Sequence, residues 1–417
     1  MGAAAVLRDG NVLRWLGAYA ASLIGDGIYF LALGWAAAQT AGPGEVGLVM
    51  AAGAVPRALL MLGGGVVADR FGPRLVVLSS DAVRCAVVLA LAAAVGLTSP
   101  GLWVLVLVAL VFGLVDALFL PAVGALPPRI AAPGQLVRVQ GLRSLAERVG
   151  HTAGPPAAGL AMGLGGPGAA FGVAAGLFGL SLLLLLTVRI SPLPAPTADP
   201  GSGSGSGPGS GPGESPWRQL RSGLAYIRRH GLIGPLVLSG ALSHLGTSAP
   251  LTLGLILLAG ERGWGPGGVG WIVGALGAGA AASALLLTLV PRFPHAGAWQ
   301  NATLIVGSAG IGALALAPTL ASAVALALVT GLVCGICGGL AVALIQTATD
   351  PSYLGRVSSV MAFTAVGLAP LAYPVFGVAA DLWGITPVFL AGGALSMAGA
   401  AIGTSAPAVR RAELSLT

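Results

Sequence analysis

The stretch Leu102-Trp-Val-Leu-Val-Leu-Val-Ala-Leu-Val-Phe-Gly-Leu114 contains no charged side chain. It lies within an apolar run over 101–124, and a helix needs about 20 residues to cross the hydrocarbon core of a bilayer. A transmembrane β-strand would instead be short and would alternate apolar and polar residues. The stretch therefore predicts a membrane-spanning α-helix.

The rest of the 417-residue chain has the same character. Charged residues make up 8% of it and apolar residues 56%, whereas about 25% of a soluble domain is charged. So few charges cannot cover the surface of a soluble protein, which excludes a cytosolic enzyme, a nucleic-acid-binding domain and a disordered chain. We predict an all-α integral membrane protein with twelve transmembrane helices in two six-helix, pseudo-symmetric bundles. The predicted spans are 14–38, 45–68, 75–97, 101–124, 140–163, 168–190, 232–258, 266–290, 298–317, 320–347, 357–381 and 385–405.

Arginine placement sets the predicted orientation. The net charge is +7 and the chain contains no Lys. The predicted loops on one side hold most of the Arg residues, and the opposite loops hold only Arg262. Because basic residues concentrate in cytoplasmic loops, we expect a multi-pass protein of the cell (plasma) membrane with both termini in the cytoplasm. We expect the lipid bilayer as its partner, no nucleic acid, and a monomer.

A linker divides the chain near its middle. Residues 191–216 are rich in Gly, Ser and Pro, a composition typical of a flexible connection. We predict an N-terminal bundle over 1–190, a cytoplasmic linker over 191–231, and a C-terminal bundle with a short cytoplasmic tail over 232–417. The linker is expected to end in a basic amphipathic helix on the inner membrane surface. Its predicted apolar face consists of Trp217, Leu220, Leu224 and Ile227.

The loop after the second span reads Gly65-Val-Val-Ala-Asp69-Arg70-Phe-Gly72-Pro-Arg74. It resembles the signature loop of the major facilitator superfamily, Gly-x-x-x-Asp-Arg-x-Gly-Arg-Lys, with Pro in place of one basic residue. The resemblance implies a conformational latch, in which Asp69 faces the positive N-terminal end of a neighbouring helix. The alternative is that Arg70 and Arg74 only orient the span at the anionic leaflet, with Asp69 as their neutralising partner.

A second stretch has similar spacing. Gly377-Val-Ala-Ala-Asp381-Leu-Trp-Gly384 lies at the predicted outer end of the eleventh span. It lacks the Arg that follows the acid in the superfamily loop. We interpret it as a turn that ends a helix.

The fifth span carries a glycine pattern: Gly141, Gly150, Gly154-Pro155 and Ala158-Gly159. It resembles the antiporter motif of the drug–proton exchangers in the same superfamily, which implies export rather than import. A separate stretch, from Phe119-Leu-Pro-Ala122 to Gln140-Gly-Leu142, resembles exporters of the macrolide-efflux type. Small residues give a smooth face for close helix packing, and Pro155 is expected to kink the span. The alternative is generic small-residue spacing, since the chain holds 68 Gly.

Charges inside the predicted spans are functional candidates, because burying a charge in lipid is costly. Asp26, Arg57 and Asp116 are the proton-coupling candidates, with the proton gradient as the energy source. The alternative is that Arg57 and Asp26 form a permanent ion pair that fixes helix register. We prefer that structural role for a pair three residues apart on the third span, Asp81 and Arg84. Many proton antiporters of the superfamily carry an Arg on span 4, and this chain does not.

The predicted central cavity has few charges, which suits a hydrophobic or amphipathic substrate. We expect no cofactor and no metal, and packing rather than redox chemistry for Cys334 and Cys337, which lie among Gly residues. Enzymatic activity is not expected, because the four His are scattered and HExxH and GxSxG are missing from the sequence. The substrate-cavity candidates are aromatic: Tyr29, Phe30, Trp35, Phe112, Phe119, Phe363 and Tyr373.

These patterns predict a secondary active transporter, a proton-coupled exporter of a small molecule such as an antibiotic, working by alternating access. Siderophore export, lipid flipping and uptake by proton symport are the alternatives within transport.

Overall fold

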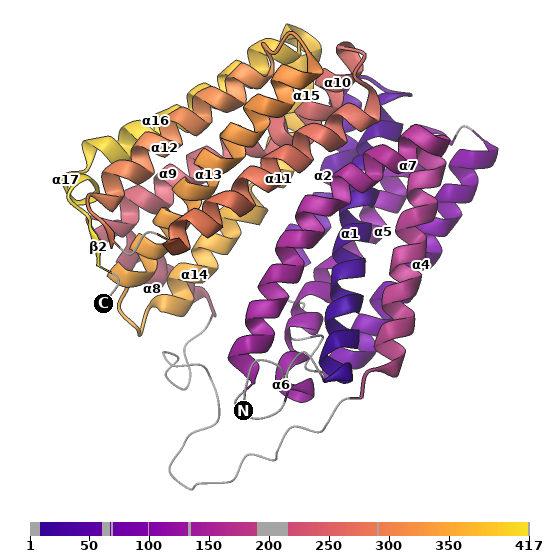
Figure 1. The fold of residues 1–417 in the computed structure, drawn as a ribbon, viewed down its shortest axis with the longest axis horizontal. Helices are drawn as coiled ribbons and strands as arrows, with labels where there is room; N and C mark the ends of the chain where they lie inside the picture. The colour runs from indigo at the N-terminus through magenta and orange to yellow at the C-terminus, as the bar shows by residue number, and fades with distance from the viewer. Residues whose placement is uncertain are drawn as a thin grey trace, which may run out of the picture. The chain divides into compact units, whose positions relative to one another are not determined.

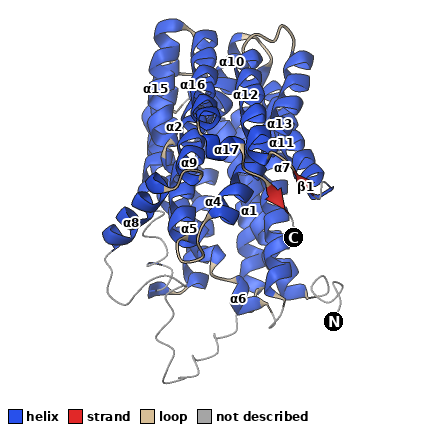
Figure 2. Cartoon of the chain, turned by 90° about the vertical axis from the view of Figure 1, so that its left-hand side faces the viewer, coloured by secondary structure: helices blue, strands red, loops and turns tan. Residues whose placement is uncertain are grey.

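The computed structural model describes residues 9–60, 67, 70–98, 100–131, 135–189, 216–289 and 292–415, and these residues are almost entirely helical (Figure 1). Two short strands are the exception: β1 (Arg292–Phe293) pairs antiparallel with β2 (Leu414–Ser415), beside the C-terminus (Figure 2). The helices are α1 (Gly10–Ala38), α2 (Pro43–Leu60), α4 (Pro73–Leu97), α5 (Leu102–Gly124), α6 (Pro127–Ile130), α7 (Leu136–Thr187), α8 (Pro216–Arg229), α9 (Ile233–Ala249), a π-helix (Pro250–Gly254), α10 (Leu255–Glu261), α11 (Gly265–Leu289), α12 (Ala296–Leu314), α13 (Leu320–Ala348), α14 (Leu354–Ala362), a second π-helix (Phe363–Gly367), α15 (Ala369–Trp383), α16 (Ile385–Ser405) and α17 (Pro407–Arg410).

The long helices follow the predicted spans. Within the described residues, nine helices are long and apolar enough to cross a membrane, and one of these, Arg138–Thr187, contains two predicted spans. The shorter helices α2 and α12 occupy the two remaining spans. The helix ends differ from the predicted ends by a few residues wherever both are described, which confirms the all-α class.

A break in α7 separates the fifth span from the sixth. Gly166 has φ +69°, a left-handed conformation that glycine adopts without strain. Gly165 before it is also non-helical. The dihedral angles at Pro155 stay helical, so the kink predicted there is no break in the helix.

The chain forms two compact units. The first comprises the described residues of Met1–Leu193, Thr252–Gly277 and Tyr373–Ile385, and the second those of Pro194–Leu251, Ala278–Ala372 and Thr386–Thr417. The predicted division of the sequence at residues 190 and 232 stays a prediction.

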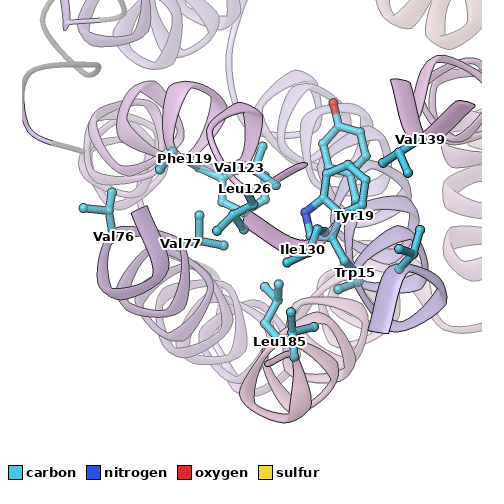
Figure 3. Close-up of a cluster of buried hydrophobic side chains, with 14 of the residues drawn as sticks. Trp15, Tyr19, Val76, Val77, Phe119, Val123, Leu126, Ile130, Val139 and Leu185 are labelled. Atoms are coloured by element: carbon cyan, nitrogen blue, oxygen red, sulfur yellow. The ribbon is translucent and has the colours of Figure 1, made fainter. Parts of the chain in front are cut away.

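One apolar cluster of the first unit lies around the start of α1 (Figure 3). The rings of Trp15 and Tyr19 stack with their centroids 5.9 Å apart, and Ile130 and Leu185 pack in the same cluster. The Tyr19 hydroxyl donates a hydrogen bond of 2.6 Å to Glu147 on α7. The buried tyrosine therefore keeps a partner for its polar end.

In the second unit, α8 packs against the protein through part of the face that was expected to lie on the membrane. The rings of Tyr226 on α8 and Tyr353 stack 4.3 Å apart. Ile227 is only 4% exposed and contacts the core of this unit, whereas Leu224 is 48% exposed. Ile227, on the predicted apolar face, therefore packs against the protein, whereas Leu224 on the same face stays exposed.

Glycines allow close contact between α2 and α5. A Cβ atom added at Gly113 would clash with the carbonyl oxygen of Gly53. Gly176 on α7 is exposed, and a Cβ atom there would meet no atom within 4 Å. A substitution at Gly113 therefore tests helix packing, whereas one at Gly176 tests only the low helix propensity of glycine.

We expect Gly113→Ala to lower the free energy of unfolding by about 1–3 kcal/mol, because the added methyl overpacks the contact with Gly53. Gly176→Ala is the matched control, and it should stabilise the helix by less than about 1 kcal/mol. Thermal unfolding in detergent measures both effects. Equal melting temperatures for the two variants would contradict the close approach of α2 and α5.

Candidate functional site

A buried arginine on α4 organises the charged side chains of the first unit. Arg84 is fully buried. Its Nη1 donates a 3.0 Å hydrogen bond to Asp26 on α1 and lies 3.5 Å from Asp116 on α5. Its Nη2 donates to Asp81, one turn earlier on α4. One guanidinium thus joins carboxylates from three helices.

A second arginine extends this ion network. Arg57 on α2 lies with its Nε 3.1 Å from Asp116, and its side chain is 29% exposed, against 2% for Asp116. We call Asp26, Arg57, Asp81, Arg84 and Asp116 the ion network. The network contains three carboxylates and two guanidinium groups, and it links α1, α2, α4 and α5.

The three carboxylates differ in their surroundings. Asp81 is fully buried and accepts a further hydrogen bond of 2.5 Å from the hydroxyl of Ser181 on α7. Asp116 lies near both arginines. Among the described residues, Asp26 has one ion-pair partner, Arg84, and its side chain is 14% exposed. Asp26 is therefore the acid with the fewest partners and the most contact with the surroundings.

Aromatic rings surround the buried guanidinium. The Cζ atom of Arg84 lies 3.8 Å from the ring centre of Phe119 and 5.0 Å from that of Phe178. Phe112 stacks on Tyr29 with ring centres 3.8 Å apart. Ring faces attract a cation, most strongly where water is excluded, so this packing helps to stabilise Arg84 away from water.

This burial corrects part of the predicted substrate cavity. Tyr29, Phe112 and Phe119 are at most 1% exposed, so they pack around the ion network and present no surface to a substrate. Phe30, Trp35 and Tyr373 are half-buried, and Phe363 is 52% exposed. These four stay cavity candidates.

The pairing of charges also differs from the sequence interpretation. The alternative of a permanent pair between Arg57 and Asp26 does not hold in the structure, because Arg57 pairs with Asp116 and Asp26 pairs with Arg84. The pair of Asp81 with Arg84 is present, yet Arg84 also binds the proton-coupling candidate Asp26. The sequence signal for Arg84 was its place inside an apolar span, where any charge needs several partners.

The glycine pattern of the fifth span packs helices of the first unit together. Gly154 approaches Gly27 of α1, so that a Cβ atom there would lie 3.0 Å from the Gly27 Cα. At Gly150 a Cβ atom would lie 2.6 Å from the Leu23 Cβ. At Gly159 a Cβ atom would lie 3.0 Å from the Pro266 carbonyl oxygen of α11. Gly141 meets no atom within 4 Å, so three of the four glycines are at contacts.

The predicted latch loop is described only in part. Gly65 and Asp69 lie outside the described residues. Gly72 has φ +84° and precedes α4. Arg74 is exposed and donates a 3.2 Å hydrogen bond to the Leu186 carbonyl on α7, while Arg70 lies 5.8 Å from the ring centre of Phe71. The latch therefore stays a prediction.

Long apolar helices, glycine-mediated helix contacts and a charged network inside the spans are typical of a polytopic membrane transporter. Residues 15–374 match the Major Facilitator Superfamily. The chain belongs to this superfamily of multi-pass membrane transporters, and it has the superfamily's twelve-helix, two-bundle fold. The family assignment indicates a transporter rather than an enzyme.

Solved structures share this fold at low sequence identity. The nucleoside transporter NupG is 14% identical, with a TM-score of 0.72 over 95% of this chain and 98% of that chain. A bacterial homologue of the human lysosomal transporter Spinster, inward-facing and occupied, is also 14% identical, with a TM-score of 0.70 over 96% and 95% of the two chains. No curated protein matches the chain in sequence.

We expect Arg84→Met to destabilise the protein by about 3–5 kcal/mol, because it leaves buried carboxylates without their common partner. Adding Asp81→Asn should recover part of the loss, since one buried negative charge is then removed. The double-mutant cycle in thermal unfolding measures this coupling. Arg74→Met, at an exposed site, is the control, and additive effects of the Arg84 and Asp81 substitutions would contradict the ion network.

Proposed function

We propose that the protein is a proton-coupled exporter of a hydrophobic or amphipathic small molecule, such as an antibiotic. In this proposal it works by alternating access in the plasma membrane, with both termini in the cytoplasm. A rocking motion of residues 1–190 against 217–405 would expose a central cavity to each side in turn. The observation that carries the proposal is the excess carboxylate in the buried ion network.

The ion network has one more carboxylate than guanidinium groups, so it can bind one proton. Three carboxylates against two guanidinium groups leave one negative charge in excess when all five are ionised. A charge inside the membrane is costly, and one bound proton makes the network neutral. Asp26 suits this role, because it has one arginine partner and its side chain is partly exposed.

Protonation of Asp26 would change the contacts between helices. A neutral carboxyl loses most of its attraction to Arg84, which keeps Asp81 and Asp116 as partners. The bond between α1 and α4 would then weaken, while the contacts of α4 with α5 stay. The cavity candidates Phe30 and Trp35 are also on α1, so the proton and the substrate would act on the same helix.

The glycine contacts of α7 support export as the direction. They pack the part of the chain that resembles the antiporter motif, and the resemblance implies an exporter. Siderophore export, lipid flipping and uptake by symport remain the alternatives, and one assay separates them.

In everted vesicles with an acidic interior, we expect the amphipathic dye Hoechst 33342 or a macrolide to accumulate against its gradient and to leave when the gradient is collapsed. Vesicles from cells with an empty vector are the control. Uptake driven only by the opposite gradient would favour symport. A protein that moves neither these probes, a siderophore nor a labelled lipid under any gradient would overturn the proposal.

We expect Asp26→Asn to abolish gradient-driven transport while protein levels stay unchanged, because the network then lacks its proton site. Infrared difference spectra between acidic and alkaline buffer test the same site without a substrate. The carbonyl stretching band of a protonated carboxyl should be present in the parent protein and missing in Asp26→Asn.

Asp350→Asn is the matched control for this measurement. Asp350 lies between α13 and α14, and hydrogen bonds from the Ser352 side chain and backbone hold the pKa of its carboxyl below the ordinary value. Its replacement should leave transport and the infrared band unchanged. A band that persists in Asp26→Asn would remove Asp26 as the proton carrier.

A further inference from the structure

The stretch Gly377 to Gly384 at the end of α15 has the spacing of the superfamily loop, Gly65 to Gly72. In both stretches an acid lies four residues after the first glycine, and a second glycine follows three residues later. The second glycines have nearly the same left-handed backbone, with φ +84° at Gly72 and +82° at Gly384. The predicted turn at the end of the helix is confirmed, but the acid in it has a further role.

Asp381 contacts the beginning of α2, within the first unit. Its Oδ2 accepts a 2.8 Å hydrogen bond from the backbone N–H of Gly44, in the first turn of α2. A Cβ atom at Gly44 would lie 2.5 Å from this oxygen. Glycine at this position is thus required for the carboxylate to reach the backbone.

The electrostatics of the two helix ends explain the contact. A negative side chain in the last turn of its own helix is unfavourable, since the C-terminal end of a helix carries partial negative charge. The first turn of α2 offers unpaired N–H groups and partial positive charge. The N-terminal end of α2 therefore stabilises the negative charge of Asp381, which the C-terminal end of α15 destabilises.

Close backbone packing lies on both sides of this hydrogen bond. A Cβ atom at Gly377 would be 2.5 Å from the Pro43 carbonyl oxygen, and one at Gly47 would be 2.6 Å from the Tyr373 carbonyl oxygen. All three glycines of the contact, Gly44, Gly47 and Gly377, are buried. The backbones of α2 and α15 thus approach each other closely at these glycines.

We propose that Asp381 is an outer latch, a contact that holds the outer ends of span 2 and span 11 together and breaks when the outer side opens. The proposal rests on the proposed alternating access, in which span 2 moves with the first half and span 11 with the second. Span 2 would then take part in two latches, one at each end. In the inner latch predicted from the sequence, span 2 would supply the acid, Asp69, whereas in the outer latch it supplies the helix N-terminus.

Because Asp381 is exposed, its contact with α2 is screened by salt and contributes modestly. Replacement by Ala should raise the ratio of outer-open to outer-closed protein about two- to fivefold, as expected for loss of one exposed charge–dipole contact. Asp381→Asn should give a smaller rise, since an amide oxygen still accepts a hydrogen bond. High salt should reduce the difference between the parent and Asp381→Asn.

The experiment measures this ratio by double electron–electron resonance on the full chain in lipid nanodiscs, across a range of pH. Spin labels are placed in a cysteine-free background at Thr98 and Ala321, which are exposed at the predicted outer ends of spans 3 and 10. Glu45→Gln is the matched control. Glu45 lies in the same first turn of α2, but it accepts its hydrogen bond from Gly42 of its own segment, so its replacement should leave the ratio unchanged.

The outcomes separate the latch from the proposed function. A rise in the outer-open population for Asp381→Ala but not for Glu45→Gln supports the latch. Two populations in the parent, with the same ratio in Asp381→Ala, would overturn the latch and leave alternating access standing. A single population in the parent at every pH, together with no transport, would overturn both.

Discussion

A guanidinium without contact to water has to be neutralised from within the protein, and this constraint organises the first unit. Arg84 meets it with carboxylates from α1, α4 and α5 and with the faces of aromatic rings. Asp26 and Asp116 approach from α1 and α5, so these helices cannot rotate or slide against α4 without breaking an ion pair. The proposed proton site follows from the same constraint, because the carboxylates outnumber the arginines that they neutralise.

Glycine is the second structural principle of the molecule. Helices of apolar residues gain little from association in lipid, where the hydrophobic effect is lost, so they depend on close packing. The contacts of Gly154 with Gly27, and of Gly377 with Pro43, bring backbones together in this way. The same close approach lets a side chain such as Asp381 reach the backbone of a neighbouring helix.

The sequence predicted the spans well because each span is a local property: a run of apolar residues of sufficient length. The partners of Asp26 and Arg57 could not be predicted, because they depend on which helix faces meet, and a single sequence does not contain that information. The burial of Ile227 was missed for the same reason, since an amphipathic face suits a neighbouring helix as well as a membrane. The role of Asp381 was missed because its pattern lacks the arginine that defines the superfamily loop.

The short pairing of β2 with β1 has a practical consequence for anyone who engineers this protein. The carboxyl-terminal segment is hydrogen-bonded to the connection that precedes α12, and the Gly297 N–H donates a further bond of 3.2 Å to the Ala412 carbonyl. A fluorescent protein or an affinity tag joined directly to this segment would disturb the start of α12. A long, uncharged spacer should therefore separate β2 from any protein or tag fused at the C-terminus.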